Sequence, residues 1–140
     1  MRRLVAAAVG LVATLGTIGV AAPSAQAAET AAIPFRSLTY GASYYSGSVS
    51  FSNRSVSATG ILHSVSGSGC RFASVTPYVG STEYPTYRSV IYCNGASGTV
   101  TVGAPADVPG GPSSVVVGLW TYDPATDTAT LVRTTKPIAR

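Results

Sequence analysis

The sequence is poor in charged side chains and in strong helix formers. Only 10% of its 140 residues are charged, and the chain holds one methionine, one tryptophan and one histidine. After the first thirty residues Glu, Lys and Gln are nearly absent, and no segment keeps an apolar period of 3.6 residues. Because amphipathic helices need that period and favour those residues, we expect no substantial helix beyond residue 30.

The scarcity of histidine and cysteine limits the chemistry as well. His63, Cys70 and Cys93 are too few for a metal site with several side-chain ligands. No G-x-S-x-G motif occurs, and the only acidic residues close in sequence, Asp123 and Asp127, are explained by the Asp-Pro start of a turn. We therefore expect no metal, no cofactor and no catalytic residue. A small hydrolase that uses His63 is the alternative.

The first twenty-seven residues are typical of an export signal. Arg2 and Arg3 form the positive start, residues 4–20 an apolar run, and Ala25-Gln26-Ala27 a small-x-small cleavage site. The run approaches the roughly 20 residues that span a bilayer, but its many Ala and Gly residues favour cleavage over a retained anchor. We predict cleavage after residue 27, which leaves an extracellular chain without a stable membrane anchor.

Cleavage would change the net charge of the protein, which affects the partners that it can attract. It removes two of the nine basic side chains and none of the five acidic ones, so the net charge falls from +4 to +2. The remaining arginines stand singly along the sequence. Proteins that bind nucleic acids follow the phosphates with clustered basic side chains, so we predict no nucleic-acid partner.

The two cysteines are predicted to form one disulfide. An oxidising exterior favours such bonds, and Cys70 and Cys93 have no other partner within the chain. The loop between them holds 22 residues, which corresponds to roughly 3 to 4 kcal/mol of stabilisation if the bond acts on the entropy of the unfolded chain.

From Ser37 onward polar and apolar residues alternate, with Gly or Pro at intervals typical of short strands. The expected strands cover residues 37–45, 47–52, 55–65, 71–79, 87–93, 99–104, 113–122 and 128–135. This pattern predicts an all-β fold, a two-sheet antiparallel sandwich of about seven to eight strands, with a squashed barrel as the alternative. The single domain would span residues 37–136, between a flexible tail at 28–36 and a short one at 137–140.

Aromatic residues from two segments are expected in the core. Residues 113–122 are apolar on both faces, which places this strand in the middle of a sheet or at an interface, and Trp120 is expected in the core. Alternation sends Tyr44 and Tyr45 to opposite faces, so at most one of them joins Tyr40 there.

The direction of His63 stays open at this point. If the strand phase set by Val56 and Ala58 continues, His63 points outward. A bulge at Gly60 would instead turn Ile61 and His63 inward.

The stretch "YVGSTEYPTY" is the best candidate for a binding loop. Tyr78, Glu83, Tyr84 and Tyr87 crowd a loop that the disulfide would close, and tyrosine supplies a large contact area at low entropy cost. The competing interpretation pairs Tyr78 with Tyr87 across a hairpin, which leaves Tyr84 as the exposed ring.

The alanine-rich leader, the alternating strands and the segment "SVSFSNRSVSATG" ahead of a single disulfide resemble the small one-disulfide β-sandwich proteins exported by high-GC Gram-positive bacteria. That group has no assigned activity, so the resemblance implies export and a β-rich fold and no site residues. We favour a secreted, non-catalytic module that binds a protein or a glycan. A structural cell-surface component, with strands that associate edge to edge, is a further alternative.

Overall fold

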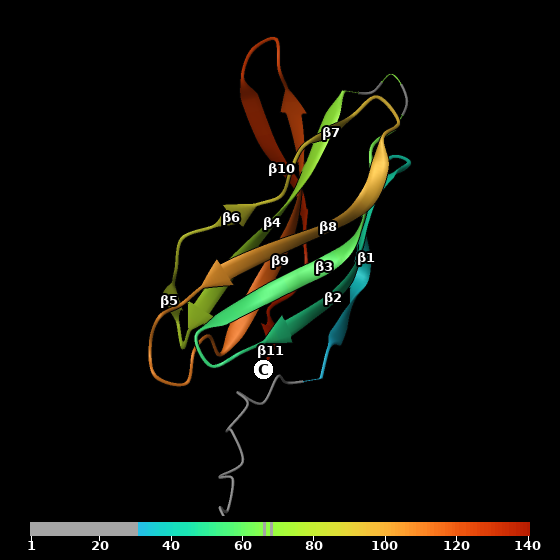
Figure 1. Ribbon diagram of the computed structural model, residues 1–140. Coiled ribbons are helices and arrows are strands. Elements are labelled where there is room, and N and C mark those ends of the chain that lie inside the picture. Colours follow the sequence, from blue (N-terminus) through green and yellow to red (C-terminus); the bar gives the residue numbers. More distant parts are fainter. Residues whose placement is uncertain (1–30, 66, 68) are drawn as a thin grey trace, which may run out of the picture.

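The computed structural model describes residues 31–65, 67 and 69–140, in which every regular element is a strand (Figure 1). The long strands are β1 (Ile33–Tyr40), β2 (Ser43–Phe51), β3 (Ser55–His63), β4 (Cys70–Val79), β8 (Ser97–Pro105), β9 (Ser114–Asp123) and β10 (Thr128–Thr134). The two-residue strands are β5 (Thr82–Glu83), β6 (Tyr87–Arg88), β7 (Tyr92–Cys93) and β11 (Ile138–Ala139). The predicted all-β fold is confirmed, and the predicted export signal lies outside the described residues.

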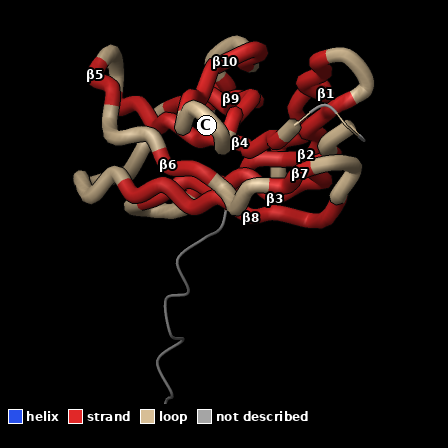
Figure 2. Tube along the Cα trace, turned by 90° about the horizontal axis from the view of Figure 1, so that it is seen from above, coloured by secondary structure: helices blue, strands red, loops and turns tan. Residues whose placement is uncertain are grey.

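Two antiparallel sheets pack face to face. Sheet A has the order β1-β2-β3-β8, and sheet B has the order β10-β9-β4, with β5, β6 and β7 following one another along the outer edge of β4. Sheet A curls into a half-barrel, so that β1 rises toward β10 (Figure 2). The strands β1 and β10 do not pair, and the fold therefore stays a sandwich with one open side.

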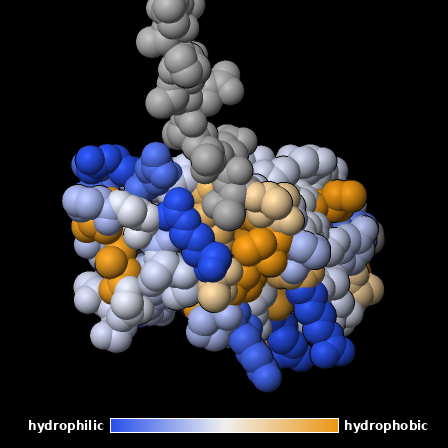
Figure 3. Space-filling view, turned by 90° about the horizontal axis from the view of Figure 1, so that it is seen from below, coloured by the Kyte–Doolittle hydropathy of each residue, from blue (hydrophilic) through white to orange (hydrophobic). Residues whose placement is uncertain are grey.

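The core fills the space between the sheets. It takes mainly alternate residues of β2, β3, β4, β8 and β9, and Tyr45, Val49, Val75, Val117 and Leu119 are fully buried in it. Strand β9 lies between β10 and β4, in the middle of sheet B, as its apolar character on both faces predicts. At the end of the sandwich where β2 turns into β3, hydrophilic and hydrophobic residues are mixed over the surface in view (Figures 1 and 3).

Both ends of the described chain belong to the sheets, contrary to the prediction of tails. Residues 33–36 form the start of β1, and β11 pairs with the start of β9. Ile33 and Ile138 pack against the core, and this apolar contact explains why the ends are ordered. The expected strand 37–45 is two strands, because Gly41, with a φ of +61°, turns the chain between them.

Strand β3 runs without a bulge past Gly60. Its pairing with β2 and β8 keeps one register from Val56 to His63, so the outward phase of His63 is confirmed and the bulge is wrong. Ile61 is accordingly 47% exposed. Gly60 lies opposite Gly47, and a Cβ on Gly60 would stand 2.2 Å from the carbonyl oxygen of Ser46. Glycine is needed here for the close approach of two backbones.

Candidate binding surfaces

The predicted tyrosine loop is spread along the edge of β4 instead of forming one cluster. Tyr78 and Glu83 lie opposite each other on β4 and β5, and the Tyr78 hydroxyl donates to the Glu83 carboxylate at 3.1 Å. Burial, and then this hydrogen bond and the negative charge, raise the pKa of Tyr78. Tyr87 lies opposite Val75, so the predicted pair of Tyr78 and Tyr87 is wrong. Tyr87 is the exposed ring, and Tyr84 is half-buried.

A pair of stacked aromatic rings lies on the outer face of sheet B. Phe72 of β4 and Trp120 of β9 are cross-strand neighbours, with ring centroids 5.5 Å apart and planes 10° from parallel. The prediction that Trp120 is a core residue is wrong. Val117 and Leu119 point into the core, so the residues between and beyond them point outward, and Trp120 is half-buried on the outside.

The stacked rings form part of a shallow hollow of about 250 Å³. This outer-face hollow is lined by Phe72, Ser74, Thr86, Arg88, Trp120 and Ala129. The lining side chains come from four strands or adjoining turns of sheet B, and all of them lie on the face away from the core. The hollow therefore combines aromatic surface, hydroxyl groups and one cation on a rigid sheet.

A hydrogen bond fixes the position of the Trp120 indole, and a neighbouring glycine leaves room for it. Its Nε1 donates a hydrogen bond to Oγ of Ser74 at 2.8 Å. Gly118 leaves the space that this contact needs, because a Cβ there would lie 2.6 Å from Oγ of Ser74 and 3.3 Å from Nε1 of Trp120. A fixed ring loses little conformational entropy when a ligand stacks on it.

The other wall of the hollow is formed by the segment that contains Thr86 and Arg88, which runs antiparallel to β4. Arg88 lies opposite Ser74, with its guanidinium carbon 5.6 Å from the centroid of the Phe72 ring. The hydroxyl groups of Thr76 and Thr86 are hydrogen-bonded to each other at 2.7 Å. The exposed guanidinium of Arg88 offers donors at the rim of the hollow.

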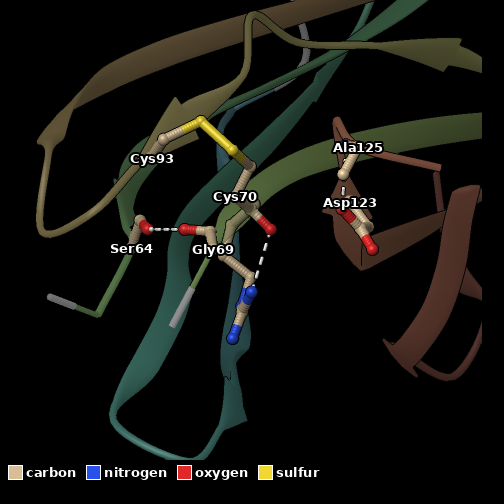
Figure 4. The surroundings of a disulfide bond; sticks show 7 residues. Ser64, Gly69, Cys70, Cys93, Asp123 and Ala125 are labelled. Atoms are coloured by element: carbon tan, nitrogen blue, oxygen red, sulfur yellow. Dashed lines mark hydrogen bonds between the residues drawn. A yellow bond between two sulfur atoms is a disulfide. The ribbon is translucent and has the colours of Figure 1, made fainter. Parts of the chain in front are cut away.

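The predicted disulfide is confirmed and ties this segment to β4. Cys70 begins β4, Cys93 ends β7, and the two are cross-strand neighbours with Cα atoms 4.0 Å apart (Figure 4). Next to the bond, the Ser64 hydroxyl donates to the carbonyl of Gly69 at 3.0 Å. The disulfide thus closes the loop that supplies Thr86 and Arg88 to the hollow.

His63 lies on the outer face of sheet A, away from this hollow. Its ring stacks on Tyr44, with centroids 5.3 Å apart and planes 27° from parallel. Within residues 31–65, 67 and 69–140, no serine hydroxyl and no carboxylate forms a hydrogen bond with the imidazole.

The carboxylates at the end of the β9–β10 hairpin accept hydrogen bonds from residues of the same hairpin. Asp123 accepts a hydrogen bond from the backbone N–H of Ala125 at 2.9 Å, as expected for an Asp-Pro turn. Asp127 accepts one from the hydroxyl of Tyr122 at 2.9 Å, and this bond is the main reason why the pKa of Tyr122 is raised. In the part of the chain that the structure describes, no three His, Cys, Asp or Glu side chains gather as metal ligands.

Of the three tyrosines of β1 and β2, Tyr45, and not Tyr40, joins the core. Tyr45 is fully buried, and burial raises its pKa to about 12. Tyr40 is 41% exposed at the disulfide end of the sandwich, where the guanidinium carbons of Arg71 and Arg133 lie 5.6 and 5.7 Å from its ring centroid. A polar hollow of about 540 Å³ opens between Tyr40, Arg71 and the β9–β10 hairpin.

Comparisons with protein-family models, with curated proteins and with solved structures find no match to this chain. The resemblance to exported proteins of high-GC Gram-positive bacteria therefore stays a prediction. Among the described residues, no helix is long and apolar enough to cross a membrane. The disulfide and the small all-β fold are compatible with an extracellular location.

The sequence reasoning missed Phe72, Ser74 and Arg88 as partners of Trp120. One signal was available, because residues 71–79 and 113–122 alternate with the same period and carry aromatic residues at outward positions near one end. That signal needed the knowledge that the two strands are neighbours, because 34 residues of chain lie between the end of β4 at Val79 and the start of β9 at Ser114.

Proposed function

We propose that this protein is a secreted, non-catalytic module that binds a glycan in the outer-face hollow. The observation that carries the proposal is the stack of Phe72 and Trp120 beside Arg88, in a hollow that also offers the hydroxyl of Thr86. A half-buried aromatic ring that stacks on a second ring is a surface on which a flat ligand can lie.

The chemistry of the hollow fits a sugar ring. The C–H groups on one face of a pyranose carry partial positive charge, and the faces of aromatic rings carry partial negative charge, so the two attract each other. Sugar hydroxyls at the rim can accept hydrogen bonds from the Arg88 guanidinium. They can also donate to, or accept from, the Thr86 hydroxyl. Because Ser74 already fixes the indole, little order has to be created on binding.

Two features of the chain support the proposed location. The first twenty-seven residues have the composition and cleavage site of an export signal. The Cys70–Cys93 disulfide persists in an oxidising exterior, and it holds one wall of the hollow in place.

The single tryptophan of the chain makes the hollow directly observable. We expect cellohexaose or chitohexaose, whose sugar rings expose flat C–H faces, to shift the fluorescence of Trp120 in a saturable way. Calorimetric titration of Trp120→Ala and of Arg88→Gln should then show affinity reduced at least about tenfold, which corresponds to about 1.4 kcal/mol.

A matched control is available on the other sheet, where Tyr44→Ala removes an aromatic ring that stacks on His63. This variant should bind the same oligosaccharide as well as the parent protein. The proposal is contradicted if Tyr44→Ala loses as much affinity as Trp120→Ala, or if neither oligosaccharide binds to the correctly folded parent.

A further inference from the structure

A groove separates the two free sheet edges, β1 of sheet A and β10 of sheet B. The strands lie near each other without pairing (Figure 2). This edge groove has a volume of about 650 Å³ and is lined by residues 34–39 on one side and residues 133–138 on the other. It shares no lining residue with the outer-face hollow, so the two surfaces can be tested independently.

The charged side chains that line the edge groove are all positive. They are Arg36, Arg133 and Lys136, and none of the three forms an ion pair with a carboxylate of the described residues. The four described acidic side chains have other partners: Glu83 binds Tyr78, Asp107 binds Arg54, Asp123 binds the backbone of its turn, and Asp127 binds Tyr122. The groove therefore attracts a negative ligand.

Arg133 lines the groove and also contacts Tyr40, which follows the lining residue Thr39. The guanidinium carbon of Arg133 lies 5.7 Å from the centroid of the Tyr40 ring. Arg133 also donates from Nη1 to the carbonyl of Val132 at 2.7 Å. These two contacts hold the cation beside the groove.

The floor of the groove is apolar. Phe35 and Leu38 reach into the core and are 9% and 6% exposed, and the other apolar lining residues are Pro34, Pro137 and Ile138. Cations above an apolar floor suit a strand in which acidic and apolar side chains alternate, because successive side chains of a strand point to opposite sides. A polyanionic glycan has no apolar side chains to place on this floor.

The backbone of the groove is also suited to a strand. Within the described residues, no strand pairs with the outer edge of β1 or with that of β10. Edge cations discourage pairing with a second copy of the same edge, because like charges would meet, whereas an acidic strand is not repelled.

We propose that the edge groove binds an extended acidic segment of a partner protein, which adds as a strand along β1. Its acidic side chains face Arg36, Arg133 and Lys136, and its apolar side chains rest on Phe35 and Leu38. Main-chain hydrogen bonds supply affinity in this mode, and the alternating side chains supply specificity.

The probe is a fluorescein-labelled peptide of about eight residues in which Glu and Val alternate, long enough for one ordinary strand. We expect saturable binding by fluorescence anisotropy, and binding at least about tenfold weaker for the peptide in which Lys replaces Glu. The same Glu-Val peptide with methyl groups on alternate backbone nitrogens should also bind at least about tenfold weaker. Methylation removes the donors of one strand edge and leaves the charges unchanged.

The double variant Arg36→Gln/Lys136→Gln removes two groove charges from exposed positions, and its binding should fall at least about tenfold. The matched control is Arg54→Gln/Arg140→Gln, which removes two exposed arginines that do not line the groove. This control should bind the peptide nearly as the parent protein does.

Three results would overturn the proposal. Equal losses in the groove variant and in its control would mean unspecific attraction to net charge. Unchanged binding of the methylated peptide would exclude strand addition. Tighter binding of hexagalacturonate than of the peptide, with the same loss in the groove variant, would assign the groove to an anionic glycan instead.

Discussion

The two sheets share one core but differ on their outer faces. The outer face of sheet A consists largely of serine and threonine, and Thr59 and Thr101 hydrogen-bond across β3 and β8 at 3.0 Å. The outer face of sheet B carries the Phe72–Trp120 stack, with Arg88 against it. Short hydroxyl side chains make a solvated wall, whereas a half-buried indole beside a cation offers a surface on which a ligand can stack. We therefore propose a structural role for the outer face of sheet A and binding for that of sheet B.

The largest expected effect comes from the bond that only sheet B contains. In the variant Cys70→Ser/Cys93→Ser the 22-residue loop is no longer closed, and the free energy of unfolding should fall by roughly 3 to 4 kcal/mol. Urea denaturation measures this change. The segment that carries Thr86 and Arg88 should also lose its fixed position, so glycan affinity should fall under conditions where the variant is still folded. If the variant kept the glycan affinity of the parent protein, the shape of the hollow would not depend on the disulfide.

A smaller loss of stability, confined to alkaline pH, is expected from Tyr45 on the inner face of sheet A. Folding raises the pKa of Tyr45 from 10.0 to about 12, so above pH 10 the unfolded chain loses a proton that the folded chain keeps. The free energy of unfolding should therefore be unaffected by this group below pH 10 and should fall by roughly 2 to 3 kcal/mol as the pH rises to 12.

The variant Tyr45→Phe removes this titration. Its hydroxyl has no hydrogen-bond partner among the described residues, so the substitution should leave the stability at pH 7 unchanged or slightly higher. Urea denaturation at pH 7 and pH 11 compares the two proteins. A loss of more than about 1 kcal/mol at pH 7 would show that the hydroxyl makes a stabilising contact.

Two glycines of sheet A provide the next comparison. A Cβ on Gly60 would meet the backbone of β2, whereas a Cβ on Gly103 would have nothing within 4 Å. Gly60→Ala should therefore lower the free energy of unfolding by about 2 kcal/mol, and Gly103→Ala should leave it unchanged or raise it slightly. Neither should alter glycan affinity in the folded protein. Thermal unfolding followed by circular dichroism tests the first expectation, and an affinity loss in either variant would contradict the second.

Local patterns were sufficient to predict much of the fold. The period of two along residues 47–52 and 55–65 predicts strands with Val49 and Phe51 on one face, and both side chains are fully buried. The disulfide followed from cysteine count and compartment. These predictions succeeded because each depends on neighbouring residues or on an unambiguous pairing.

The candidate sites depended on which strands are neighbours, and that is a property of the whole fold. Trp120 belongs to an apolar strand, but its side is decided by the packing of Val117 and Leu119 on sheet A. Arg36 and Lys136 stand singly in the sequence and meet only because the curl of sheet A brings β1 beside β10. Periodicity within one strand contains no information on either arrangement.

The central claim, that binding belongs to the outer face of sheet B, is tested most directly by mapping the bound glycan with NMR. The isotope-labelled protein is titrated with whichever of cellohexaose and chitohexaose shifts the fluorescence of Trp120 more. We predict that the perturbed resonances centre on the Trp120 indole N–H and on the amides of Phe72, Ser74 and Arg88, while those of Tyr44 and His63 stay in place. Perturbations centred on Tyr44 and His63, with the Trp120 indole unchanged, would contradict the account.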